Sequence, residues 1–582
     1  MRRAVFAAVV AACAVFALAG AADSTGQRDA FAAIDRAGGE LPKNVVPSSY
    51  TIDLDPDRAH DRIDADERIV VTVRRPAGAI VLDALQIAFR SAQLDGIAAR
   101  VSLDPKRQTA TLHFAAPVAP GVHTLAISYR AKLQHSDQGL FVQPYTDDAG
   151  KPAYLYATQL EPTDARRVFP SFDEPAFKAR FTISFVVPRS FTAVSNMPVI
   201  AQTPMGSLKR VRFAATPPMS TYLVALAAGE FDAVHAVSDG IRLGVYATRG
   251  KRAAEQYALG VMQRLMPYFD SYYGIKYPLP KLDSIAIPGD FDGAMENWGA
   301  ITYVEDELLF DPRAQPDSDK RDIVDVTAHE TSHQWNGDLT TMAWWDELWL
   351  NEGFATYMEA AYREQRIGRD DYMSEIRQDA ADFLINDTMN KKRRPLFNLN
   401  AMDVDALFDD SNNSTTYQKG GAVLHQLREQ VGTEAFWKAI NIYLNAHKFA
   451  NAESTDLRKA MEQASGQDLG WWFDQWVYSG GAPSLNVTQV WHPRTKTLTV
   501  SVAQIQKADA ITPGAFRLPL DIKFTTASGD ETEKMEITKR LQVFSYKLPA
   551  RPSKLELDPS DKIPLKTVKI HPVALARAAG DE

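Results

Sequence analysis

The sequence predicts a multidomain α+β protein: an N-terminal antiparallel β domain, a mainly helical middle domain and a C-terminal β-sandwich. In the early and late parts of the chain, apolar residues alternate with polar ones, which is typical of half-buried strands. Between these parts the apolar residues recur at helical spacing. With 582 residues and about 100–200 residues per domain, the length suits about three to five domains.

Period-two alternation predicts the N-terminal β domain over residues 23–245, and the helical pattern predicts the middle domain over residues 246–480. Alternation returns after a Gly- and Pro-rich boundary, so residues 481–566 are predicted to form the β-sandwich. The tail, residues 567–582, ends in an Ala-rich polar stretch and is expected to be disordered. Examples of the alternation are Tyr50, Ile52 and Leu54; Leu125, Ile127 and Tyr129; and Leu498, Val500 and Val502.

Composition excludes several classes of protein. The chain is 24% charged and 45% hydrophobic, as folded soluble proteins are. Its 64 Lys and Arg against 73 Asp and Glu give a net charge of −9, so the broad positive field that supplies non-specific nucleic-acid affinity is absent. The one cysteine, Cys13, excludes a disulfide framework and a cysteine-ligated metal. Metal ligands, if present, must be His, Asp or Glu.

Residues 1–22 are predicted to be an export signal. Arg2 and Arg3 precede an apolar run from Ala4 to Gly20, and small residues at 19–21 suit signal peptidase. Export predicts a periplasmic or extracellular protein with no stable membrane span after processing. Two alternatives stay open. One is an uncleaved anchor, which the alanine-rich run disfavours. The other is a lipid-anchored N-terminus at Cys13, because residues 10–13 resemble a lipobox.

The strongest motif is H-E-x-x-H at residues 329–333, inside the helical block. Histidines at i and i+4 lie on one helix face, so His329 and His333 can reach one zinc ion while Glu330 leans toward its water. A helix with two surface histidines is the ordinary alternative. Glu352, after eighteen intervening residues, argues against that alternative because it completes a two-His, one-Glu ligand set of the catalytic type.

This motif predicts hydrolysis at a carbonyl. Zinc in such sites activates a water molecule, and Glu330 can take the proton and pass it to the leaving amine. The developing oxyanion needs a further hydrogen-bond donor, for which Tyr417 is the candidate. The ordinary reading of Tyr417 is a packed tyrosine with its hydroxyl at a wet edge. Trp344, Trp345 and Trp349 are expected to be core residues.

With these residues in place, the chain resembles the aminopeptidase N family of gluzincin zinc metallopeptidases from about Leu41 to Pro564. The resemblance rests on the zinc motif with its Glu, the block around Tyr417, the G-A-M-E-N block at residues 293–297, and the segment at residues 159–175. It implies a saddle-like β domain, a thermolysin-like catalytic domain and a β-sandwich. It further implies one Zn²⁺ per chain, bound by His329, His333 and Glu352, with Glu330 as general base and acid and Tyr417 stabilising the tetrahedral intermediate.

The resemblance also assigns substrate contacts. Glu296 would bind the α-ammonium of the substrate, helped by Glu161 and Gln159, and Gly293 and Ala294 would pair their backbone with the substrate in strand fashion. Paired carboxylates suit a terminal ammonium, which an internal peptide position cannot supply. Without the resemblance, residues 293–297 would be interpreted as a loop between strands, and Glu161 as a surface carboxylate.

Three departures from the family pattern stand out. Residues 335–338 read Trp-Asn-Gly-Asp where relatives commonly have Asn in the last position, a change expected not to touch a ligand. Asp292, expected to border the pocket for the first side chain, either favours Arg or Lys as the removed residue or faces solvent. The chain is expected to be a short three-domain form, because the sequence stops soon after the predicted β-sandwich, where many relatives carry a C-terminal helical domain. Leukotriene hydrolases keep that helical domain and lack the β-sandwich, so their epoxide hydrolase activity is not supported.

The sequence therefore predicts an exported zinc aminopeptidase that acts on peptides with a free N-terminal amine. The alternatives are an endopeptidase with the same metal site and a catalytically inactive family member that binds peptides as a scaffold.

Overall fold

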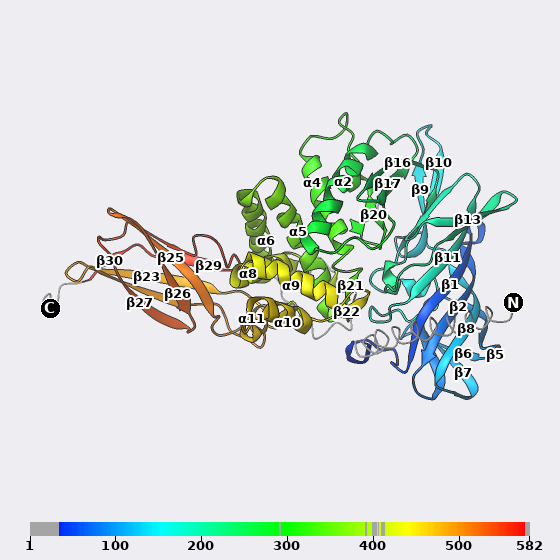
Figure 1. The fold of residues 1–582 in the computed structure, drawn as a ribbon, viewed down its shortest axis with the longest axis horizontal. Helices are drawn as coiled ribbons and strands as arrows, with labels where there is room; N and C mark the ends of the chain where they lie inside the picture. Colours follow the sequence, from blue (N-terminus) through cyan, green and yellow to red (C-terminus); the bar gives the residue numbers. More distant parts are fainter. Residues whose placement is uncertain are drawn as a thin grey trace, which may run out of the picture. The chain divides into compact units, whose positions relative to one another are not determined.

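The computed structural model describes residues 34–289, 291, 293–389, 393–397, 404, 407–408 and 414–576. The predicted signal (1–22) and Asp292 therefore lie outside the described residues. The elements follow the predicted order: a β-rich region, a largely helical region and a second β-rich region (Figure 1). Within the described part of the chain, every helix is too short or too polar to span a membrane.

The fold comprises two compact units whose limits differ from those of the three regions. The first unit holds the described residues within Met1–Pro267, Lys276–Trp345 and His447–Glu453. The second holds those within Tyr268–Ile275, Asp346–Ala446 and Ser454–Glu582. All five boundaries between the units fall within the predicted middle domain, residues 246–480, so each unit contributes its own helices to that domain.

An eight-stranded sheet forms most of the N-terminal β domain, in the order β13-β14-β11-β1-β2-β8-β4-β5. Tyr50, Ile52 and Leu54 of β1 are buried, as the alternation predicted. The strands are β1 (Val45–Asp57), β2 (Arg62–Val73), β4 (Ala88–Leu94), β5 (Ile97–Ala98), β8 (Gly121–Lys132), β11 (Arg180–Pro188), β13 (Val199–Met205) and β14 (Leu208–Phe213). A three-stranded sheet contains β3 (Ala77–Asp83), β6 (Arg100–Asp104) and β7 (Thr109–Val118).

Two further sheets of the first unit pack together and position the site. A four-stranded sheet has the order β12-β15-β10-β9, and a five-stranded sheet has the order β16-β17-β18-β20-β19. A shared apolar core joins them: Phe141 and Leu155 of the four-stranded sheet pack with Ile285 and Ile287 of the five-stranded one. The strands are β9 (Gly139–Thr146), β10 (Pro152–Gln159), β12 (Thr192–Ser195), β15 (Leu226–Gly229), β16 (Phe231–Ser238), β17 (Ile241–Thr248), β18 (Lys281–Ile287), β19 (Ala294–Met295) and β20 (Ala300–Val304).

The predicted domain boundary at residues 245/246 falls inside β17. Strand β17 pairs with β16 on one side and, in parallel, with β18 on the other. Strands on both sides of the expected boundary thus belong to one sheet. Alternation cannot reveal this boundary, because a strand has the same period in either domain.

The helices are divided between the units. Helices α3 (Glu305–Leu308) and α4 (Asp319–His333) belong to the first unit, as does the parallel pair β21 (Thr340–Met342) and β22 (Ala450–Ala452). Helix α2 (Glu255–Tyr273) crosses the division after Pro267. The second unit contains α5 (Trp349–Arg366), α6 (Arg369–Met389), α8 (Gln418–Val431), α9 (Thr433–Ala446), α10 (Ser454–Ser465) and α11 (Gly470–Trp476). Short 3-10 turns are η1 (Arg58–His60), η2 (Ala165–Arg167), η3 (Thr221–Leu223) and η4 (Trp345–Glu347).

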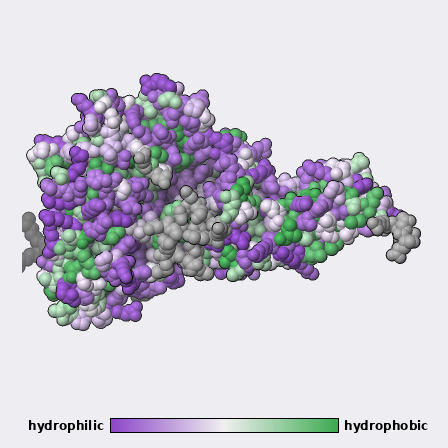
Figure 2. Space-filling view, turned by 180° about the vertical axis from the view of Figure 1, so that it is seen from behind, coloured by the Kyte–Doolittle hydropathy of each residue, from purple (hydrophilic) through white to green (hydrophobic). Residues whose placement is uncertain are grey.

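The C-terminal region has a five-stranded and a three-stranded sheet that meet at Phe524 and Tyr546, whose rings are 4.9 Å apart. Its strands are β23 (Ser484–His492), β24 (Thr497–Gln504), β25 (Leu518–Thr526), β26 (Gly529–Ile537), β27 (Leu541–Lys547), β28 (Lys554–Leu557), β29 (Thr567–Ile570) and β30 (Ala574–Leu575). Figure 2 shows hydrophobic residues among polar ones on the surface of this region. Leu541 and Val543 of β27 are among the exposed ones.

The expected disorder of residues 567–582 is wrong for the part described. Strands β29 and β30 both pair in parallel with β23. The side chains of β29 and β30 are exposed, and backbone hydrogen bonds to β23 hold both strands in the sheet. A pattern of buried and exposed residues therefore could not reveal them.

Helices α5 and α8 cross at two glycines. A Cβ on Gly353 would lie 2.9 Å from the Cα of Gly420, and a Cβ on Gly420 would lie 2.7 Å from the Cα of Gly353. Both distances are shorter than any carbon–carbon van der Waals contact. The two backbones can therefore approach this closely only because neither residue has a side chain.

We predict that Gly420→Ala destabilises the protein by about 1–3 kcal/mol, because the added methyl group overpacks this crossing. The measurement is the thermal midpoint. Gly260→Ala is the matched control: it lies in helix α2 with only an Arg264 side-chain tip 3.6 Å away. This control should leave the midpoint unchanged or raise it. Equal midpoints for Gly420→Ala and wild type would contradict the account of the crossing.

A second prediction concerns Glu67, a buried acid in β2. It lies opposite Ile52 and Ile127 and is 2% exposed. Neither carboxylate oxygen has a hydrogen-bond partner among the described residues. Burial therefore raises the pKa of Glu67 well above its ordinary value. The folded state keeps the Glu67 carboxyl protonated at pH values where the unfolded state ionises it. The free energy of unfolding therefore falls as pH rises from the unfolded-state pKa toward the folded-state pKa.

Glu67→Gln removes this pH dependence of stability. The thermal midpoint of the variant should therefore rise relative to that of wild type between pH 5 and pH 8. The gain corresponds to at most about 1.4 kcal/mol per pH unit. The control is Asp66→Asn, because Asp66 is an exposed neighbour on the same strand. The difference in thermal midpoint between this variant and wild type should stay constant from pH 5 to pH 8. A constant difference for Glu67→Gln as well would show that this carboxyl does not titrate in the way its burial requires.

Candidate metal and substrate site

Helix α4 carries three of the predicted residues in the expected arrangement. The His329 and His333 rings lie one turn apart with their centroids 4.9 Å from each other. Their metal-binding atoms are within 4.8 Å of one another. Glu330 and His333 are both buried on this helix. The helix predicted from the spacing of the motif is therefore confirmed, with both imidazoles on one face.

A backbone carbonyl orients the His333 ring. Nδ1 of His333 lies 3.1 Å from the carbonyl oxygen of Asn336. A carbonyl only accepts hydrogen bonds, so Nδ1 carries the hydrogen and Nε2 is the nitrogen that can bind a metal. Asn336 and Asp338 donate their own N–H groups to the carbonyls of Ser332 and His333. These contacts are made by backbone groups, so they do not depend on the side chains at which residues 335–338 depart from the family pattern.

Glu352, the third predicted ligand, is buried in the first turn of α5. A buried polar network anchors the start of this helix. The indole N–H of Trp349 donates to Oγ of Ser454 at 2.9 Å, and the Ser454 N–H donates to the Glu347 carboxylate at 2.9 Å. His329 and His333 of the first unit and Glu352 of the second each carry a side chain that can bind a metal ion. Two imidazoles and one carboxylate fit zinc, and they match the ligand set of catalytic zinc sites.

Glu296 follows edge strand β19 and is tied to helix α4. Nε2 of Gln334 donates to the Glu296 carbonyl at 2.8 Å. Oε1 of Gln334 accepts from the Gly299 N–H at 2.9 Å and from the Tyr277 hydroxyl at 3.1 Å. The Glu296 side chain is buried, with Oε1 4.0 Å from Nδ1 of His333. One amide thus holds the loop that carries Glu296 against the helix that carries the histidines.

Glu161 and Gln159 reach the same place from the end of β10. The carboxylate oxygens of Glu161 and Glu296 lie within 4.8 Å of each other. Nε2 of Gln159 donates to the sulfur of Met295 at 3.6 Å. The apolar core between the two sheets brings these segments together. Glu161 is half-buried and lies beside Glu296 rather than alone on the surface.

Gly293 and Ala294 form the edge of the five-stranded sheet. Gly293 has a φ of +61°, a conformation that favours glycine, and its carbonyl accepts a hydrogen bond from Val304. Ala294 and Met295 make up β19, so residues 293–297 are not a simple loop. An edge strand can accept a further strand on its outer side.

Tyr417 stands at the N-terminal end of α8, directly before Gln418, and its side chain is half-buried. The Gly353–Gly420 crossing fixes α8 against α5, which carries Glu352. Of the three tryptophans expected in the core, Trp345 and Trp349 are fully buried and Trp344 is partly exposed.

A charged pair, buried Asp338 and half-buried Lys178, lies beside this site. Burial raises the pKa of Asp338 well above its usual range, and Glu296 and Glu330 add to the rise. Burial also lowers the pKa of Lys178 to about 7, against the opposing effect of Asp338. Nζ of Lys178 donates to the Asp338 carbonyl at 2.9 Å. Neither Lys178 nor Gln334 belongs to a recognisable motif, because their partners are far away along the chain or are backbone groups.

Two stretches of the chain match models of protein families. Residues 46–223 match the Peptidase M1 N-terminal domain, and residues 257–476 match the Peptidase family M1 domain. Aminopeptidase N of Acetobacter pasteurianus is 47% identical over 326 residues, which are 56% of this chain and 92% of that protein. Aminopeptidase M1-C of Oryza sativa subsp. japonica is 35% identical over 457 residues, 78% of this chain and 52% of that protein.

Puromycin-sensitive aminopeptidase of Caenorhabditis elegans is 31% identical over 522 residues, 87% of this chain and 54% of that protein. The chain thus spans about half the length of the rice and nematode relatives. Most of the Acetobacter protein, in contrast, is matched. Together with the three-region architecture and the His-His-Glu group, these matches lead to one conclusion: the chain belongs to the aminopeptidase N family of gluzincin metallopeptidases, peptidase family M1.

Proposed function

We propose that this protein is a zinc-dependent aminopeptidase that hydrolyses the N-terminal peptide bond of peptides. The observation that carries the proposal is the pair of carboxylates, Glu161 and Glu296, whose oxygens lie within 4.8 Å of each other. Glu296 is in turn 4.0 Å from His333 of the zinc motif. The names of the relatives support a peptidase of this kind.

Paired carboxylates beside a metal site suit the substrate's α-ammonium. Two like charges at this separation repel, and a cation between them relieves that repulsion. An α-ammonium has three N–H donors, which can form charge-assisted hydrogen bonds to both carboxylates. An internal peptide group has no such charge. This feature supports an exopeptidase over an endopeptidase with the same metal ligands.

The proposed ligands are His329, His333 and Glu352, one Zn²⁺ per chain. A zinc ion bound there would lower the pKa of a coordinated water to about 7 and polarise the scissile carbonyl. Glu330, one residue from His329 on α4, would take the proton from water and deliver it to the departing amine. The Tyr417 hydroxyl would donate a hydrogen bond to the developing oxyanion. Gly293 and Ala294 at the sheet edge would pair with the substrate backbone.

A catalytically inactive peptide-binding scaffold is the alternative from another class. The presence of Glu330 beside the two histidines argues against it, because a scaffold does not need a general base. We further propose that residues 1–22 direct export to the periplasm or outside the cell. We also propose that Asp292 favours peptides whose first residue, the one removed, is Arg or Lys.

We predict that Glu330→Gln lowers kcat by about 10²–10⁴-fold, because it removes the proton acceptor. Zinc content should stay at one ion per chain, since no ligand is changed. The measurements are turnover of an aminoacyl anilide and metal analysis of the same sample. Asp322→Asn, an exposed acid in the first turn of α4, is the control and should retain wild-type turnover. A zinc-loaded Glu330→Gln enzyme with wild-type turnover would overturn the mechanism.

Glu296→Gln tests recognition of the substrate's N-terminus. The substitution keeps the side-chain shape but removes one charge, so kcat/KM for free-amine peptides should fall about 10–100-fold, as expected for a lost charge-assisted hydrogen bond. Wild type should cleave the same peptides far more slowly when they are N-acetylated. Equal rates on free and acetylated peptides would favour the endopeptidase alternative.

A further inference from the structure

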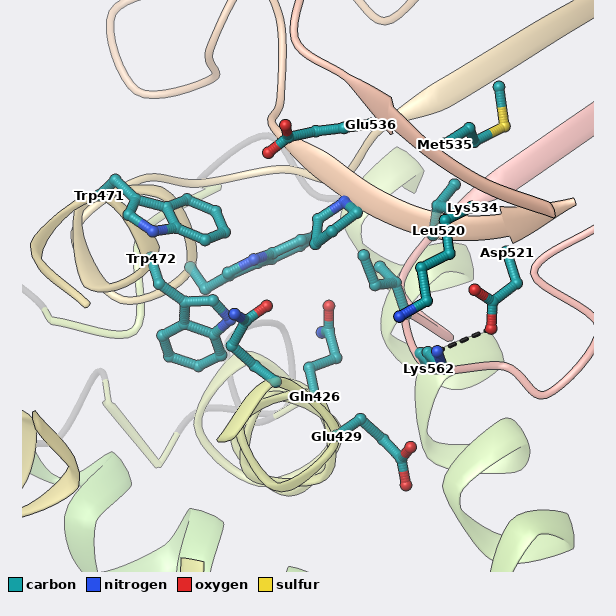
Figure 3. Close-up of a pocket in the computed structure, with 14 residues that line it drawn as sticks. Gln426, Glu429, Trp471, Trp472, Leu520, Asp521, Lys534, Met535, Glu536 and Lys562 are labelled. Atoms are coloured by element: carbon teal, nitrogen blue, oxygen red, sulfur yellow. Dashed lines mark ion pairs between the residues drawn. The ribbon is translucent and has the colours of Figure 1, made fainter. Parts of the chain in front are cut away.

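A cavity of about 480 Å³ lies entirely within the second compact unit, in the size range of ligand pockets. Helices α8 and α11, strands β25 and β26, and residues 562–563 form its walls (Figure 3). None of the residues assigned above to metal, catalysis or substrate lines it. Its chemistry can therefore be considered separately from that of the zinc site.

The floor of the cavity carries a buried amide without hydrogen bonds. Gln426 of α8 is 2% exposed, and neither its amide oxygen nor its amide nitrogen has a hydrogen-bond partner among the described residues. Figure 3 shows its side chain pointing from α8 into the space between Trp472 and Lys534. Gln430, one turn further along the helix, differs: its Nε2 donates to Oε1 of Gln467 at 2.9 Å. A buried amide left unsatisfied is costly, so Gln426 indicates a missing partner.

The acidic groups around the cavity are already compensated. Asp521, Glu536 and Glu429 each have a basic partner. The pairs are Asp521–Lys562 at 2.7 Å (Figure 3), Glu536–Arg517 at 2.6 Å and Glu429–Arg369 at 2.7 Å. A strongly charged ligand would have to compete with these pairs. Lys534, which also lines the cavity, has no ion pair among the described residues, but its side chain is exposed to solvent, which screens its charge. The cavity can therefore accept a neutral ligand.

The walls favour an aliphatic group over a sugar ring. Leu520, Met535 and Ile563 are apolar residues that line the cavity and are themselves buried. Trp472 and Trp476 also line it but are almost fully buried, so neither offers an open indole face. The Arg517 guanidinium lies 4.2 Å over the Trp471 ring and covers one of its faces. A pyranose ring would need a broad open aromatic face to stack on.

We propose that this cavity binds a neutral peptide segment. An apolar side chain occupies the space between the tryptophans and the aliphatic residues. The adjacent peptide group pairs with Gln426: the amide NH₂ of Gln426 donates to the peptide carbonyl, and its oxygen accepts from the peptide N–H. The site is an accessory peptide-binding site, and its existence does not depend on the proposed aminopeptidase activity.

The test uses N-acetyl-leucine methylamide, a neutral peptide mimic without the ammonium that Glu296 and Glu161 would bind. Its binding to the full-length, zinc-loaded protein is followed by tryptophan fluorescence. We expect saturable binding, and Gln426→Met should raise Kd at least about tenfold by removing both hydrogen bonds. Gln430→Met is the matched control, and its Kd should stay within about twofold, because its amide already pairs with Gln467.

The thermal midpoint of each variant separates loss of binding from loss of folding. Gln426→Met should melt at or above the wild-type temperature, because an unsatisfied buried amide is replaced by an apolar side chain of similar size. A wild-type Kd in Gln426→Met, an equal loss in Gln430→Met, or no binding to wild type would overturn the proposal. Preferential binding of cellobiose would overturn it in favour of a carbohydrate site. None of these outcomes depends on peptide turnover.

Discussion

The candidate site of the first unit depends on one buried side-chain amide. Gln334 directly follows the second zinc-motif histidine, and its three hydrogen bonds hold the segment from Glu296 to Gly299 against the end of α4. The Gln334 amide donates to the Glu296 carbonyl and accepts from the Gly299 N–H. These two hydrogen bonds fix the Glu296 backbone relative to the helix that carries His333. The proposed aminopeptidase activity would need this precision, because the distance from the substrate's terminal ammonium to the metal would decide which bond is cut.

In the second unit, the close crossing of helices α5 and α8 fixes the positions of the functional side chains. Gly353 and Gly420 let the backbones of α5 and α8 touch, and Glu352 and Tyr417 lie within a turn of these two glycines. The contacts of Ser454 with Trp349 and Glu347 fix the beginning of α5. Both units thus hold their functional side chains on packed elements rather than on long loops, which gives a site the positional accuracy that catalysis requires.

The sequence predicted the parts of this arrangement that local spacing encodes. The i, i+4 histidines determined their shared helix face, and alternation identified buried positions such as Tyr50 and Ile52. Gln334 escaped notice because its partners, Tyr277, Glu296 and Gly299, lie far from it along the chain. The same limit applies to β29 and β30: backbone pairing with β23 holds them in the sheet without the burial that a pattern would reveal. The proximity of Glu161 to Glu296 could be expected only from family resemblance.

The central claim is that one zinc ion binds to His329, His333 and Glu352. Crystals of the purified protein, measured above and below the zinc absorption edge, test it most directly. The account predicts one strong anomalous peak per chain, within about 2.0–2.2 Å of Nε2 of His333, of a His329 ring nitrogen and of a Glu352 carboxylate oxygen. A zinc-replete protein with its anomalous peak elsewhere, or with a peak bound to the two histidines but not to Glu352, would contradict it.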